Sequence, residues 1–196
     1  MSGTVLTKTY PLPAVGEEEV WRYAACREAD EGMRELLFSC VEEAAPRVAC
    51  RVCYARYPLE AAGNTCRFGG VEWHSAALAA RLADCREAVL FAATLGAGFD
   101  RLLQKYSRLS PARALLLQAY GTACVEALCD TFCAEFPDAT PRFSPGYGDW
   151  ALTAQRDVFR LLEPSRHIGV CLNDSLLMTP VKTVTAVLGI EGEGSR

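Results

Sequence analysis

The chain has 196 residues and a net charge of −4, and its mass of 21.3 kDa suits one domain, or one domain plus a short appendage. Hydrophobic residues make up 51% and charged residues 22%, which is enough apolar material for a core and excludes an intrinsically disordered chain. Because there is no excess of Lys and Arg, we expect neither nucleic-acid binding nor a polybasic membrane anchor.

The first half of the chain contains patterns for strands and helices in alternation. In order, they predict a strand over 5–10, a helix over 17–28, a helix from the N-cap Asp30 to Pro46, a strand over 48–57 and a short Ala-rich helix over 74–83. Alternating apolar residues give the segment 48–57 a period of two, which is typical of a strand. We expect this strand to pair with the Gly-flanked segment 65–68.

The second half begins with an apolar segment over 88–95 that predicts a central strand, since both of its faces are hydrophobic. Ser110 and Pro111 supply a capping hydroxyl and a proline at the first helical position, and the helix they start is predicted to reach about Glu135. The remaining patterns predict a loop over 137–147, a helix that starts at Trp150 or Leu152 and ends at Leu162, strands over 168–172 and 183–190, and a polar tail over 191–196. This order lacks a regular βαβ alternation. It predicts a single α+β domain whose largely antiparallel, twisted sheet is flanked by helices.

Ten cysteines are spread along the chain. Whether they are free thiols or form disulfides depends on the cellular compartment. No stretch approaches the roughly 20 apolar residues of a membrane span, and the first residues lack the pattern of a signal peptide. We therefore expect a cytoplasmic protein whose cysteines are free thiols that pack as small hydrophobes. Cys50 and Cys53 form a C-x-x-C, but a strand would send them to opposite faces, so we expect no metal site. A redox or metal protein built on the cysteines remains an alternative.

The segment Arg142–Tyr147 carries the most chemical information. A planar Arg fork can grip a carboxylate in two places, a Gly lets the backbone approach a ligand closely, and a Tyr offers a flat face and a hydroxyl. Such a loop suits an anionic or zwitterionic small molecule with a planar ring. The same residues would also make an ordinary Pro-Gly turn with a solvent-facing Arg.

The C-terminal half resembles the activation (reactivation) domain of cobalamin-dependent methionine synthase. The loop fits the R-x-x-x-G-Y signature of that family. Further segments that fit in order and spacing are Leu90–Gly96, Asp100–Leu102, Val125–Ala127, Phe159–Leu162, Ile168–Val170, Leu172–Ser175 and Met178–Pro180. The resemblance divides the chain into a less diagnostic N-terminal part over 1–86, an activation-domain-like core over 87–190 and the tail over 191–196.

The resemblance implies a stand-alone protein that binds S-adenosylmethionine and supports the reductive methylation of cob(II)alamin. The cobalamin would be carried by methionine synthase or another corrinoid protein, with flavodoxin or another reductant supplying the electron. Arg142 would hold the ligand carboxylate, the backbone of Ser144, Pro145 and Gly146 would line the adenine, and Tyr147 would shape the loop. Glu126 either faces the ligand ammonium or, together with Asp130 four residues later, belongs to a solvated helix face. No residue is expected to act as a general acid or base, so the protein would be an accessory component of methyl transfer.

The sequence departs from the family at its end. The family has a pair of ligand-contacting tyrosines beyond its last matched strand, whereas residues 191–196 contain no aromatic side chain. A second hypothesis follows from this difference: the protein has the same fold and docks on a corrinoid protein as a regulatory module, but it no longer binds S-adenosylmethionine.

Overall fold

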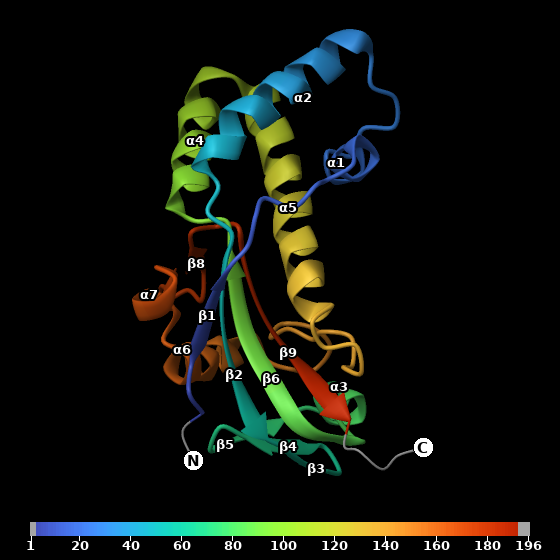
Figure 1. Cartoon of the computed structure of the whole chain (residues 1–196), viewed down its shortest axis with the longest axis vertical. Coiled ribbons are helices and arrows are strands. Elements are labelled where there is room, and N and C mark those ends of the chain that lie inside the picture. Colours follow the sequence, from blue (N-terminus) through green and yellow to red (C-terminus); the bar gives the residue numbers. More distant parts are fainter. Residues whose placement is uncertain (1–2, 192–196) are drawn as a thin grey trace.

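A four-stranded antiparallel sheet forms the centre of the protein in the computed structural model, which describes residues 3–191 (Figure 1). The strands are arranged in the order β1 (Leu6–Thr9), β2 (Arg51–Pro58), β6 (Cys85–Thr94) and β9 (Thr183–Glu191). Each neighbouring pair is antiparallel. The predicted α+β fold with an antiparallel sheet flanked by helices is therefore confirmed.

Both faces of the sheet are buried, because successive residues of β6 enter two separate hydrophobic cores. Val89 and Phe91 belong to the core on one face, whereas Ala88 and Leu90 belong to the core on the other. This arrangement explains why the segment 88–95 is apolar throughout, since a strand with one solvated face would alternate with polar residues.

Four helices contribute to the core of the first face: α1 (Glu17–Tyr23), α2 (Glu31–Ala44), α4 (Ala97–Leu109) and α5 (Pro111–Cys133). α5 lies along the sheet, whereas α1, α2 and α4 pack on α5 beyond the upper end of the sheet (Figure 1). As predicted, the side chain of Asp30 caps α2 by accepting a hydrogen bond from the Met33 amide, and the Ser110 hydroxyl caps α5. Phe132 near the end of α5 is fully buried and packs against Tyr54 and Phe91 of the sheet. These contacts hold the C-terminal end of α5 against β2 and β6.

The second face is covered by shorter elements and by a separate three-stranded sheet. They are β3 (Glu60–Ala62), β4 (Thr65–Phe68), β5 (Val71–His74), α3 (Ala76–Arg81), α6 (Gln155–Leu162), α7 (Pro164–His167), β7 (Cys171–Leu172) and β8 (Met178–Thr179), with the 3₁₀ turn η2 (Leu152–Ala154). A second 3₁₀ turn, η1 (Ala45–Arg47), follows α2 and contacts α4 instead. Trp73 and Trp150 meet edge-to-face at 5.6 Å in this core, where both are almost completely buried. No helix within residues 3–191 is long and apolar enough to cross a membrane.

The predicted pairing of the strand over 48–57 is wrong. β2 pairs with β1 and β6, whereas the segment 65–68 forms β4 and pairs with β3 and β5. The reason is local: glycines with positive φ at Gly63, Gly69 and Gly70 allow tight turns, so β3, β4 and β5 close into neighbouring hairpins.

Two element boundaries also differ from the prediction. The helix expected over 17–28 ends at Tyr23, because Ala25 adopts a left-handed φ of 53° that breaks the helical path. The strand expected over 168–172 is reduced to Cys171–Leu172, since Pro164 starts the short helix α7 and Gly169 has a φ of 72°. The polar tail beyond residue 191 lies outside the described residues.

Candidate functional site

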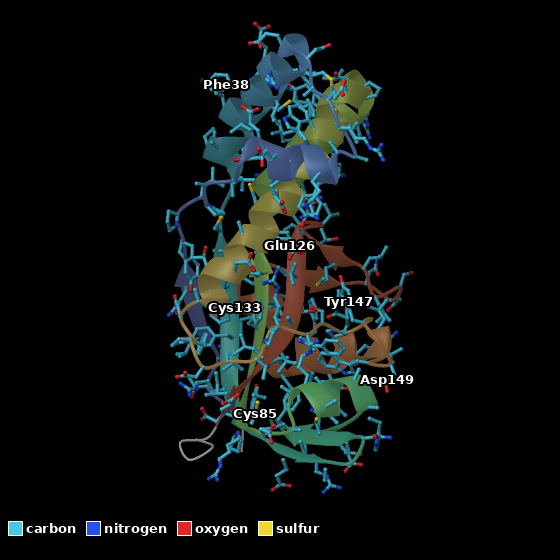
Figure 2. All side chains as sticks on the ribbon, turned by 90° about the vertical axis from the view of Figure 1, so that its right-hand side faces the viewer. Phe38, Cys85, Glu126, Cys133, Tyr147 and Asp149 are labelled. Atoms are coloured by element: carbon cyan, nitrogen blue, oxygen red, sulfur yellow. The ribbon has the colours of Figure 1, made fainter. Side chains whose placement is uncertain are left out.

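A groove of about 1170 Å³ lies along β9, between α5 and the loop that follows it. Figure 2 shows the arrangement: α5 with Glu126 and Cys133 lies on one side of β9, and Tyr147 lies on the other. Thr183, Val184 and Thr185 of β9 contribute to the lining, as do residues of the loop over 139–147, of α6 and of the turns around β8. Elements that are far apart in the sequence therefore build this groove.

Most of the residues predicted as a ligand site come together in this groove. Arg142, Ser144, Pro145, Tyr147 and Glu126 all line it. Gly146 does not line the groove but stabilises the turn of the loop. Its φ is 95°, and its amide donates a hydrogen bond of 2.7 Å to the carbonyl oxygen of Trp150. A residue with a side chain would be strained at this φ, so Gly is required here by the backbone.

Two contacts fix the loop to the body of the domain. Phe143 and Val187 of β9 exchange two backbone hydrogen bonds of 2.8 Å, so the loop extends the sheet locally beyond β9. The ring of Phe143 also stacks on Trp150 with a centroid distance of 6.0 Å, and Trp150 is only 2% exposed. The segment that carries Ser144–Tyr147 is thus held at one end by the half-buried Phe143 and at the other by the buried Trp150.

Asp149 provides a third anchor that the sequence analysis missed (Figure 2). Its carboxylate accepts hydrogen bonds from the Ser75 hydroxyl at 2.5 Å and from the amides of Ala76 at 2.7 Å and Ala77 at 3.0 Å. These donors hold the pKa of Asp149 below its usual range, the Ser75 hydroxyl having the largest effect. Asp149 thereby ties the loop to the start of α3. No sequence spacing signals this contact, because Ser75 and Asp149 come from distant segments.

Arg142 is the central charged group of the groove, and it is already paired. Its Nη2 atom lies 2.5 Å from Oε2 of Glu126, and its Nη1 atom donates to Oδ1 of Asp130. Burial lowers the pKa of Arg142, but the hydrogen bonds with Asp130 and Glu126 outweigh it, so the pKa rises and the guanidinium stays charged. One cation between two carboxylates gives this group of three a net charge of −1.

Gln155 and Thr185 add polar groups to the groove lining that sequence patterns did not reveal. Both side chains are almost completely buried, and the Thr185 hydroxyl donates to Oε1 of Gln155 at 2.9 Å. Around the groove lie Tyr147, Leu152, Leu177 and Val181, whose large apolar side chains are exposed. The groove thus combines a charged wall and a polar lining with an apolar rim.

Solved structures with a similar fold include the MetH reactivation domain bound to AdoHcy. The two superpose with a TM-score of 0.76 at 12% sequence identity, and the alignment covers 100% of this chain and 81% of the solved chain. This chain has the fold of the MetH reactivation domain. No family model and no curated protein matches the sequence.

Seven of the ten cysteines are buried packing residues of this fold, whereas Cys26 and Cys133 are half-buried and Cys171 is exposed. Cys50 and Cys53 are buried in different cores, on opposite faces of the sheet as predicted. Burial raises the pKa of Cys50 to about 11 and that of Cys53 to about 12, which keeps both as unreactive thiols at neutral pH. Within residues 3–191, no three His, Cys, Asp or Glu side chains form a group that could hold a metal ion.

Proposed function

We propose that the groove along β9 binds S-adenosylmethionine and that the protein supports reductive methylation of cob(II)alamin on methionine synthase or another corrinoid protein. The observation that carries this proposal is the Arg142–Glu126 pair on the groove wall, in a fold whose solved neighbour holds AdoHcy. AdoHcy, S-adenosylhomocysteine, is the product that remains when S-adenosylmethionine loses its methyl group.

The residues present fit the two ends of this ligand. Its amino-acid end carries one carboxylate and one ammonium, and the wall offers a guanidinium and a carboxylate 2.5 Å apart. At the other end, the backbone of Ser144 and Pro145 and the exposed ring of Tyr147 offer polar groups and a flat surface for an adenine. The groove volume of about 1170 Å³ is large enough for such a molecule.

In this role the chain works by binding and positioning. When bound, S-adenosylmethionine supplies an electrophilic methyl group, and its transfer to cobalamin that has taken up one electron from a reductant such as flavodoxin leaves S-adenosylhomocysteine. No proton moves in that transfer, so the groove requires no general acid or base. Arg142 and Glu126 would orient the amino-acid end, and the loop anchored by Trp150 would fix the adenine end.

The exposed apolar side chains around the groove are an argument that a partner protein binds there. Eight large hydrophobic side chains are exposed within residues 3–191, and four of them, Tyr147, Leu152, Leu177 and Val181, line this groove. Clustered exposed apolar groups with a polar surround are typical of an interaction surface. We propose that the corrinoid-carrying partner covers this rim and so brings its cofactor to the methyl donor.

One observation favours the alternative of a docking module that does not bind S-adenosylmethionine. Both Nη atoms of Arg142 are engaged by carboxylates of the chain itself, which compete with a ligand carboxylate. The two functions differ in one measurable property, since only the first requires affinity for the free methyl donor.

Isothermal titration calorimetry with S-adenosylmethionine and S-adenosylhomocysteine tests the proposal. Substitution Arg142→Ala removes a charge-assisted contact and is expected to weaken binding by about 1.5–3 kcal/mol. Arg67→Ala is the matched control, because Arg67 pairs with Glu72 on the separate three-stranded sheet and does not line the groove. A loss below about 0.5 kcal/mol for Arg142→Ala would place the ligand elsewhere. No binding by the wild-type protein at millimolar ligand would favour the docking module.

A further inference from the structure

We infer that Asp130 determines which charged ligands the groove accepts, because its carboxylate occupies one of the two terminal nitrogens of the Arg142 guanidinium. This inference rests on the proposed function and concerns the selectivity of the same site. Its basis is the pairing of Arg142, whose Nη1 atom donates to Asp130 and whose Nη2 atom donates to Glu126. A ligand carboxylate that approaches the end of the fork in the two-point geometry needs both of these nitrogens.

The charge of the wall is set by the same contacts. Asp130 and Glu126 lie one turn apart on α5, where two like charges repel each other, and a single guanidinium bridges them. The resulting net charge of −1 attracts an ammonium and repels a carboxylate. A zwitterionic amino-acid end therefore meets one favourable and one unfavourable interaction at this wall.

The solvent exposure of the two carboxylates shows which of them a ligand carboxylate can displace from Arg142. The side chain of Asp130 is 69% exposed, whereas that of Glu126 is 37% exposed. An exposed ion pair contributes little net free energy, because water solvates the separated charges well. Asp130 can therefore turn into solvent when a carboxylate takes its place, while Glu126 stays beside Arg142 and faces the ammonium.

Two opposite effects follow for ligands that differ only in their charged groups. With Asp130 present, a zwitterion must displace it, but a ligand with an ammonium and no carboxylate gains from the extra negative charge. Replacing Asp130 with Asn makes the wall neutral. This substitution is expected to strengthen binding of the zwitterion and to weaken binding of the ammonium-only ligand.

The experiment compares three ligands that share the adenosine group. They are S-adenosylhomocysteine as the zwitterion, its decarboxylated analogue 5′-deoxy-5′-(3-aminopropylthio)adenosine as the ligand without a carboxylate, and 5′-methylthioadenosine as the ligand without either group. Calorimetry on Asp130→Asn is expected to give about three- to tenfold tighter binding of the first and about three- to tenfold weaker binding of the second. Binding of the third is expected to stay within about twofold, and both changes should shrink at high salt.

Asp157→Asn is the control variant, since Asp157 pairs with Arg160 on α6 and does not line the groove. Asp130→Ala, together with the far-UV circular dichroism of each variant, shows that a change in affinity does not arise from misfolding. Weaker binding of S-adenosylhomocysteine, or equal changes for all three ligands, would overturn the inference while leaving the proposed function standing. If neither the wild type nor Asp130→Asn binds any of the three, the proposed function fails and the inference falls with it.

Discussion

Gly121 lies in the middle of α5, at the point where this helix packs closely on α4. A Cβ atom added there would lie 2.4 Å from Cε1 and 2.7 Å from Cζ of Phe99, and 3.0 Å from Cε of Lys182. Substitution Gly121→Ala gains about 1 kcal/mol of helix propensity. The overlap with a fully buried ring costs about 2–3 kcal/mol, so the net effect is a destabilisation of about 1–2 kcal/mol.

Urea unfolding followed by circular dichroism measures this change, and a thermal scan should show a melting temperature lower by about 2–8 °C. Gly32→Ala on α2 is the matched control, because the added Cβ would meet only Oδ1 of Asp30 at an ordinary 3.5 Å. That variant is expected to be as stable as the wild type, or more stable by up to about 1 kcal/mol. The penalty of Gly121→Ala should shrink in a Phe99→Leu background. If Gly121→Ala proves as stable as Gly32→Ala, the close packing described here is wrong.

Two further predictions concern the loop and the thiols. Removing the Asp149 carboxylate by Asp149→Ala should speed hydrogen exchange at the amides of Gly146 and Trp150, with little change in the sheet. Unchanged protection would mean that the contacts of Phe143 and Trp150 are enough to hold the loop. The pKa of Asp149 is lowered in the folded state, so its contribution to stability is present above an ordinary Asp pKa of about 4 and is lost as the pH falls through the lowered value. In the native protein, a thiol reagent at pH 8 should modify the exposed Cys171 faster than the buried Cys129, whose pKa is raised mainly by burial; equal rates would contradict this burial.

Local signals in the sequence were sufficient to predict most of the elements of the fold. The capping residues Asp30 and Ser110 mark the starts of α2 and α5, and the continuous apolar segment identifies β6 as the central strand. The partner of β2 was not predictable in the same way. Its alternating pattern shows that it is a strand, but pairing depends on which other edge is free, and β3–β5 had already closed into hairpins of their own.

The candidate site was predictable only where its residues are consecutive. The loop over 142–147 could be proposed from its own chemistry, and the resemblance added Glu126 on α5. The sequence placed Asp130 four residues after Glu126 on one helix face, but only the structure pairs it with Arg142. The roles of Asp149 and Gln155 were not predictable, because they depend on contacts with segments far away in the chain. A polar residue on a helix face gives no sign of the loop that will pack beside it.

Formation of the groove depends on the strand that is synthesised last among the described elements. β9 contributes Thr183–Thr185 to the groove and pairs with β6 along almost its whole length, from Thr94↔Thr183 to Glu87↔Ile190. Until the ribosome has released this segment, one entire edge of the most apolar strand of the protein has no hydrogen-bonding partner. A nascent or prematurely terminated chain that lacks β9 would therefore present an open template for intermolecular association, and its survival would depend on chaperones that shield β6 during translation.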